Sequence, residues 1–220
     1  MRRRDLIAAL GVALWPGLGR AGVQRLPLTE AFVMLDSYLA LAPGERDRFS
    51  FAYRLMRSKK PAPGARAAFV DKAGARTPVT LSPDGTVQNL PTLAQLKSKA
   101  VFEIDGDDYQ FVLEPLAAIA PATRIDVGDL AASLAELNAA VAKFARAQGA
   151  EIAKLTTAYF PGVLAGAAVF ADGSSKPLSV FDFKALGPTP YFEPRKAPGA
   201  IAVTLDKPPS RIVLAGPPSH

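Results

Sequence analysis

The stretch AVFEIDGDDYQFVL, residues 100 to 113, holds two apolar runs on either side of an Asp-Gly pair. Asp-Gly between two strand-like runs is a strong short-range signal for a β-hairpin. The stretch therefore predicts two antiparallel strands, at 100 to 104 and 109 to 113, joined by a tight turn at 105 to 108.

Similar strand-like runs surround this hairpin on both sides. Between 49 and 55, aromatic and aliphatic residues alternate with polar or small ones, which is the two-residue period of a half-buried strand. Turn-forming Gly, Pro and Asp residues separate further runs, which lie at 66–71, 77–81, 86–89, 164–171, 177–183, 200–205 and 210–214. The pattern is typical of antiparallel meanders.

Three segments show helical spacing instead. Apolar residues predict a helix over 29–41, a short helical turn from Thr92 to Lys97, and a long amphipathic helix from Asp129 to Gln148. Ile152 and Leu155 suggest a further turn or a short partner helix after Gly149. The predicted fold class is α+β, with antiparallel β-meanders packed on helices.

The order of these segments repeats along the chain. The run Ala67–Val70, followed by Gly74 and Pro78, resembles the run 167–170, followed by Gly173 and Pro177. Residues 100–113 can also be laid on 201–214 without a gap. We therefore expect an internal duplication of a helix-plus-meander unit, with similar halves at 22–120 and 121–220 that form two domains or share one core. The alternative is chance similarity between two strand sets rich in Ala and Val.

The first 21 residues predict an export signal. Three arginines precede an apolar run that Pro16 ends after ten residues, which is too short to span a membrane, and small residues up to Ala21 suit cleavage there. Arg3-Arg4-Asp5-Leu6-Ile7 resembles the twin-arginine export signal, and the general secretory route is the alternative. We expect a periplasmic or secreted protein with no transmembrane segment in its mature chain.

Composition excludes several kinds of chemistry. The chain has no cysteine, and its single histidine is the last residue, His220, so thiol nucleophiles, disulfides, catalytic triads and His-based zinc sites are not expected. Removing residues 1–21 takes away four of 26 basic and one of 20 acidic residues, which lowers the net charge from +6 to +3. We expect neither a nucleic-acid partner nor a cofactor.

A basic segment is the first candidate binding site. Arg54, Arg57, Lys59 and Lys60 lie in a stretch that reaches Arg66 without an acidic residue. These side chains could hold an anionic ligand, lipid head group or envelope polymer. Alternatively, the stretch is a solvated connection between two strands.

An acidic cluster is a weaker candidate for a metal site. Asp105, Asp107 and Asp108 provide oxygen ligands of the kind that Ca²⁺ prefers, but their spacing does not match an EF-hand. Because Asp-Gly is itself a hairpin signal, we interpret the cluster as a turn and predict no metal.

Tyr191 and Phe192 lie in a proline-rich segment that we interpret as a loop, because proline is excluded from central strands. Their rings could bind a sugar, peptide or protein, or could fold back onto the core. Asp182 and Glu193 could act as acid and base in a glycoside hydrolase. The sequence favours a non-catalytic binding module for an unknown envelope protein, polymer or small ligand. A carboxylate-dependent envelope hydrolase is the alternative, and a structural envelope component is a third hypothesis.

Overall fold

The computed structural model describes residues 22–150, 153–183 and 187–218. The predicted export signal, with Arg3, Arg4 and Ala21, lies outside these residues. The chain forms two compact units. Unit 1 consists of Met1–Ala42 and Phe51–Glu114, and unit 2 of Pro43–Ser50 and Pro115–His220.

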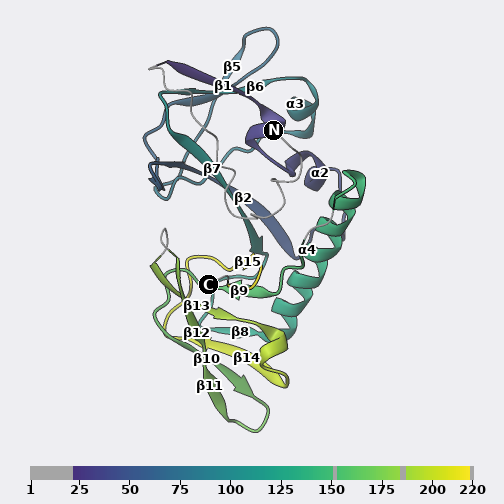
Figure 1. The fold of residues 1–220 in the computed structure, drawn as a ribbon, viewed down its shortest axis with the longest axis vertical. Helices are drawn as coiled ribbons and strands as arrows, with labels where there is room; N and C mark the ends of the chain where they lie inside the picture. The colour runs from purple at the N-terminus through teal and green to yellow at the C-terminus, as the bar shows by residue number, and fades with distance from the viewer. Residues whose placement is uncertain (1–21, 151–152, 184–186, 219–220) are drawn as a thin grey trace. The chain divides into compact units, whose positions relative to one another are not determined.

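Unit 1 contains a four-stranded sheet in which all neighbours are antiparallel. Its order is β1-β6-β4-β5, formed by β1 (Val23–Pro27), β6 (Val101–Asp105), β4 (Ala67–Val70) and β5 (Arg76–Pro78) (Figure 1). A second group of strands has the order β7-β2-β3, with β7 at Tyr109–Ala117, β2 at Phe49–Arg57 and β3 at Lys60–Pro61. The strands predicted at 100–104 and 109–113 form as β6 and β7, but they belong to different sheets, so the prediction that they pair as a hairpin is wrong. Both edges of β6 are already occupied by β1 and β4, which leaves none for β7.

The helices of unit 1 are short. In place of one helix over 29–41, the chain forms α1 (Leu28–Ala31) and α2 (Leu35–Leu39). The prediction fails because Met34 adopts a left-handed backbone conformation, with φ of 67°, which a continuous α-helix cannot contain. The predicted helical turn is confirmed as α3 (Leu93–Lys97), which begins with a capping box between Thr92 and Gln95.

Aromatic side chains fill the core of unit 1. Phe32 is fully buried, and its ring centroid lies 5.1 to 6.0 Å from those of four other rings, those of Tyr53, Phe69, Phe102 and Phe111. Tyr53 donates a 2.6 Å hydrogen bond to the Val33 carbonyl, and burial raises its pKa well above the ordinary value. The alternating pattern of β2 thus provides the inward-facing side chains of this core.

Unit 2 contains a second antiparallel four-stranded sheet. Its order is β11-β10-β14-β8, formed by β11 (Ser175–Pro177), β10 (Gly166–Phe170), β14 (Ala200–Leu205) and β8 (Arg124–Asp126). Four more strands have the order β12-β13-β9-β15, with β12 at Ser179–Phe183, β13 at Gly187–Phe192, β9 at Thr157–Tyr159 and β15 at Val213–Ala215. A 3-10 turn, η1 (Pro194–Lys196), follows β13.

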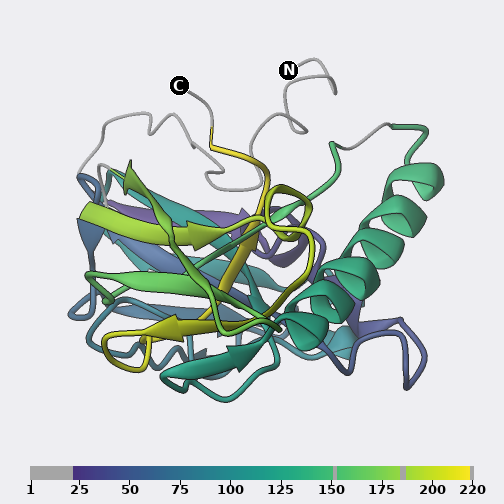
Figure 2. The same ribbon diagram turned by 90° about the horizontal axis from the view of Figure 1, so that it is seen from below.

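The long predicted helix is confirmed as α4 (Val127–Ala147), which is continuous over its whole length (Figure 2). Asp126 caps it by accepting hydrogen bonds from the amides of Gly128 and Asp129. Leu130 and Leu137 are fully buried on its apolar face, and the helix contacts β8 and β14. Among the described residues, no helix is long and apolar enough to cross a membrane.

No short partner helix forms at 153–156. The amide of Leu155 donates to Asn138 Oδ1, and Asn138 Nδ2 donates to the Leu155 carbonyl, both at 2.8 Å. The α4 side chain thus satisfies the backbone of Leu155 directly, without helical hydrogen bonds, and Ile152 lies outside the described residues.

The proline-rich segment is a strand, β13, which lies between β12 and β9, so the prediction of a loop is wrong. Pro190 pairs with Val180 of β12, and its carbonyl accepts a 3.0 Å hydrogen bond from the amide of Phe160. Pairing with β9 begins only at Tyr191. The prolines therefore lie where the ladder to β9 needs no donor from them.

The β-hairpins β4–β5 and β10–β11 share a hydrogen-bond pattern. Three bonds of the first hairpin, Asp71 N to Ala75 O, Gly74 N to Asp71 O and Val79 N to Ala67 O, have counterparts in the second, Phe170 N to Ser174 O, Gly173 N to Phe170 O and Leu178 N to Gly166 O. Each donor and each acceptor of the second hairpin lies 99 positions after its counterpart in the first hairpin.

Candidate functional site

The first residue of the predicted basic site is internal. Arg54 is buried in unit 1, where its Nη1 donates to Glu114 Oε1 at 2.8 Å and its Nε donates to the Asp84 carbonyl at 3.1 Å. Its position thus makes Arg54 a structural residue, in contrast to the surface role that the sequence suggested.

The remaining three basic residues lie on the β2–β3 hairpin. Arg57 pairs with Lys60, and the two residues between them, Ser58 and Lys59, have φ values of 48° and 65°. Two successive residues with positive φ define a type I′ turn, which normally favours Asn-Gly. This hairpin thus keeps two strained non-glycine residues at its tip.

The acidic cluster lies at the turn between β6 and β7, which connects two sheets and does not close a hairpin. Its carboxylates contact the basic hairpin: Asp107 Oδ1 lies 3.2 Å from Arg57 Nη2, and Ser58 Oγ donates to Asp108 Oδ2 at 2.8 Å. The described part of the chain contains no group of three acidic or His residues that could hold a metal ion.

An open hollow of about 480 Å³ lies beside the basic hairpin, entirely within unit 1. Arg57, Ser58 and Tyr109 line one part of it, and the segment Pro61–Ala65 lines the rest. The Arg57 guanidinium carbon lies 5.3 Å from the centroid of the Tyr109 ring, a cation–π distance. Arg57 is thus held between an aromatic ring and a carboxylate.

Lys59 and Lys60 are exposed, and within the described residues neither side chain makes an ion pair. Lys60 faces Arg57 across the hairpin, so two positive side chains occupy directly opposed positions on one face. Like charges in this arrangement are unfavourable, and Asp107 compensates only Arg57. The hairpin therefore carries uncompensated positive charge on two residues that directly follow Ser58 and precede Pro61, both of which line the hollow.

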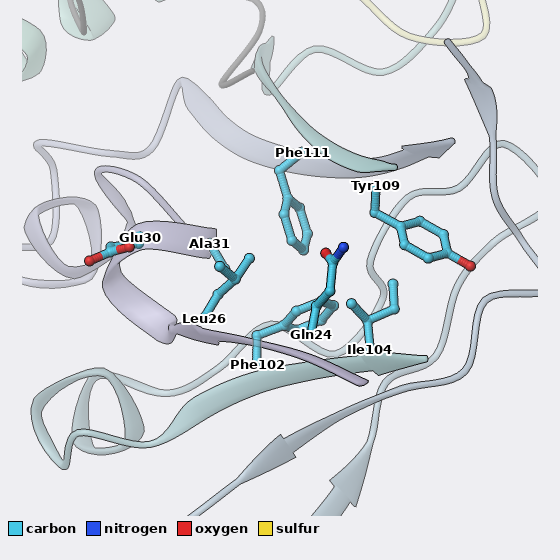
Figure 3. Close-up of a pocket in the computed structure, with 8 residues that line it drawn as sticks. All are labelled: Gln24, Leu26, Glu30, Ala31, Phe102, Ile104, Tyr109 and Phe111. Carbon is cyan, nitrogen blue, oxygen red and sulfur yellow. The ribbon is translucent and has the colours of Figure 1, made fainter. Parts of the chain in front are cut away.

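A second cavity, of about 20 Å³, lies against the aromatic core of unit 1. Phe102 and Phe111 form part of its wall with Leu26, and their ring centroids are 4.9 Å apart. The carboxylate of Glu30 and the hydroxyl of Tyr109 both point away from this cluster in Figure 3. The cavity has room for about one water molecule and is too small for a ligand.

The predicted aromatic pair is divided between core and surface. Phe192 is 2% exposed, so it is a core residue of unit 2 and offers no surface to a partner. Tyr191 is half-buried, and its ring centroid lies 5.6 Å from that of Tyr159. Burial, with the charges of Tyr191 and Glu193 nearby, raises the pKa of Tyr159 to about 12.

The two candidate hydrolase carboxylates are in different environments. Asp182 is exposed on β12, which lies at the end of its sheet. Glu193 is 8% exposed, and its Oε1 lies 2.7 Å from Lys196 Nζ, an ion pair that raises the pKa of Lys196. Neither carboxylate lines either of the two cavities described above.

Two parts of the hollow were missed at the sequence level. Tyr109 directly follows the acidic turn, and Pro61–Ala65 follows the basic hairpin. The charge pattern alone could not predict that the two turns meet, because that contact depends on the pairing of four strands.

Comparison of the chain with protein-family models, curated proteins and solved structures found no match. The class of the protein is therefore given by its own architecture, which is α+β with antiparallel sheets.

Proposed function

We propose that this chain is an exported, non-catalytic binding protein built from two copies of one helix-plus-meander unit. The observation that supports binding best is the hollow of unit 1, whose lining residues Ser58 and Pro61 directly flank Lys59 and Lys60 in the sequence. Among the described residues, neither lysine makes an ion pair. The proposed location is the periplasm or the extracellular medium.

The duplication is supported by the order of the strands. The sheet β1-β6-β4-β5 corresponds strand by strand to β8-β14-β10-β11, with antiparallel neighbours throughout. In each unit the N-terminal edge strand leads directly into a helix, α1 or α4. Chance similarity between segments rich in Ala and Val would not explain why the two sheets have the same strand order.

Register supports the duplication as well. Leu26 pairs with Phe102 and Phe102 with Phe69, while Ile125 pairs with Val203 and Val203 with Ala168. From the first sheet to the second, the residues of the edge strands (Leu26, Ile125) and of β4 and β10 (Phe69, Ala168) are offset by 99 positions, and those of β6 and β14 (Phe102, Val203) by 101. A crystal structure in which the two sheets do not superpose strand on strand would contradict the duplication.

The competing hypothesis is a carboxylate-dependent hydrolase. That reaction needs an acid and a base on opposite sides of a substrate. Glu193 is held by Lys196, and Asp182 lies on an exposed edge strand, which gives the hypothesis little support.

One experiment separates the binder from the hydrolase. The purified mature chain is incubated with acidic and neutral envelope polysaccharides, and both retention of the polymer and release of reducing ends are measured. We expect retention of an acidic polymer without product. Product release that is lost in D182N/E193Q would instead establish the hydrolase.

Export is tested separately, with a C-terminally tagged full chain in a bacterial host. We expect a shortened protein in the periplasmic or extracellular fraction. The variant R3K/R4K should leave the precursor in the cytoplasm if the twin-arginine route operates, and normal processing of this variant would favour the general secretory route.

A further inference from the structure

We infer that the hollow beside the β2–β3 hairpin binds an oxyanion, the phosphate or carboxylate group of a small ligand, and that only unit 1 carries this site. The inference rests on the proposed binding function and specifies where the ligand binds and which chemical group is recognised.

The first support is that the hairpin is an addition to the common unit. Arg54 bridges to Thr86, and the amide of Leu55 donates to the Gly85 carbonyl. In unit 2, Tyr159 pairs with Tyr191, and the amide of Phe160 donates to Pro190. Arg54 and Tyr159 therefore occupy equivalent positions.

Spacing after these equivalent positions differs between the units. Ala68 comes 14 residues after Arg54, whereas its counterpart Ala167 comes eight residues after Tyr159. Unit 1 is thus longer by six residues in the segment that contains the basic hairpin. Because unit 2 forms the same four-stranded sheet without these residues, the sheet itself does not require the basic hairpin.

The second support is the strain and charge of the hairpin tip. Left-handed conformations at Ser58 and Lys59 cost roughly 1 kcal/mol or more per residue. The opposed pair Arg57 and Lys60 adds like-charge repulsion. Neither feature stabilises the unit, so both are better explained by a role in binding an anion, which would relieve the repulsion.

The third support is the distribution of nearby charges. Asp107 is paired with Arg57, and Asp108 accepts a hydrogen bond from Ser58. Asp105 lies next to the basic residue Arg66, whose carbonyl accepts a hydrogen bond from the Asp105 amide. After these contacts, the lysines of the tip remain as cations without a carboxylate partner in the described part of the chain.

The shape of the hollow suits a small ligand. Its volume of about 480 Å³ lies within the range of roughly 300 to 1,000 Å³ typical of small-molecule sites. Between Pro61 and Ala65 the lining has no charged side chain, so the charged groups lie at one side only. A ligand with one oxyanion and an uncharged body would match this arrangement.

The test is an NMR titration of the ¹⁵N-labelled mature chain at constant ionic strength. Glycerol 3-phosphate and galacturonate are the charged probes, and glycerol and galactose are their neutral counterparts. We expect at least one charged probe to shift the amide signals of Tyr109 and of the non-proline residues between 57 and 66, and the neutral probes to leave them unchanged. The charged probe that binds more tightly distinguishes phosphate from carboxylate.

Variants determine whether the tip lysines are responsible. K59Q/K60Q should weaken binding roughly tenfold, since each exposed charge contributes up to about 1 kcal/mol. K72Q/K99Q removes two exposed lysines elsewhere in unit 1 and should bind like the wild type. Equal losses in both variants, signal changes confined to other residues, or no signal change with either charged probe would overturn the inference. Binding mapped to other residues would leave the proposed binding function intact.

Discussion

Arg54 Nη1 and Glu114 Oε1 meet at 2.8 Å inside unit 1, where the two side chains are only 7% and 8% exposed. In the proposed duplication, Arg54 corresponds to Tyr159 of unit 2, which packs beside Tyr191. The proposal therefore implies that one strand position carries a buried ion pair in one unit and an aromatic pair in the other.

Removing one partner of this pair should be costly. In E114A, Arg54 would keep a buried charge whose remaining carboxylate partner is the more exposed Asp84, with Oδ2 3.7 Å from Arg54 Nε. We therefore expect a loss of about 3 kcal/mol in the free energy of unfolding, at the low end for breaking a buried pair. R54M/E114L, which removes both charges, should recover most of the loss. Urea denaturation measures both effects.

The matched control is the exposed pair of Arg48 and Asp129, whose side chains are 52% and 57% exposed. R48A should cost less than about 1 kcal/mol. If E114A cost no more than R48A, the buried pair would have no special role.

Stability should fall in acid. Burial alone would raise the pKa of Asp84, but hydrogen bonds from Ser82 and Thr86 outweigh it and hold the pKa below its ordinary value. Hydrogen bonds from Arg76 and Arg25 likewise lower the pKa of Glu103. A carboxyl group whose pKa is lower in the folded state stabilises the protein above its unfolded pKa, and that stabilisation disappears as the pH falls through the folded pKa.

The measurement is urea denaturation of the wild type and of D84N/E103Q between pH 7 and pH 2. The variant should be less stable at pH 7 and should lose less stability between about pH 4.5 and pH 2. Parallel pH profiles for the two proteins would contradict the role of these carboxylates.

Replacing Lys99 and Lys97 with glycine should change the free energy of unfolding in opposite directions. Lys99 is exposed and has φ of 62°, so K99G removes left-handed strain and should raise the free energy of unfolding by about 1 kcal/mol. Lys97 is the last residue of α3, where K97G should lower it by roughly 0.5 to 1 kcal/mol. Thermal denaturation of both variants is sufficient, and destabilisation by K99G would show that its side chain matters more than its backbone.

Replacing Lys59 at the hairpin tip with glycine should increase the stability of the chain and weaken its binding of an oxyanion. K59G relieves the left-handed strain at Lys59 and should stabilise the chain by about 1 kcal/mol. It also removes one of the two unpaired charges and should weaken the binding of the oxyanion probe. If K59G left binding unchanged, Lys60 and Arg57 would account for recognition alone.

The sequence predicted elements better than their connections. The periodic apolar residues of α4 act locally, and the prediction of this helix is confirmed. The Asp-Gly signal marks the turn between β6 and β7 correctly, but the two strands pair in different sheets, which a local signal cannot reveal. Met34 broke a predicted helix because its left-handed conformation depends on packing, which periodicity does not reveal. Pro190 was mistaken for a loop residue because the side of the strand that its nitrogen faces depends on the register.

The candidate site was predicted only in part. Arg57 lines the hollow, and Lys59 and Lys60 are exposed on the same hairpin, whereas Arg54 and Phe192 are internal. Alternation along β2 could have indicated that Arg54 lies on the opposite face of the strand from Tyr53 and Leu55. It could not have indicated that both faces of the strand are buried.

The tip of the β2–β3 hairpin also marks a place where the chain could accept new sequence. Lys59 and Lys60 are exposed there, and in the proposed duplication unit 2 forms its sheet with a shorter link at the corresponding place. A peptide epitope, a fluorescent label or a second binding loop could therefore be grafted between these lysines. Such a graft would make the hairpin an attachment point for protein engineering.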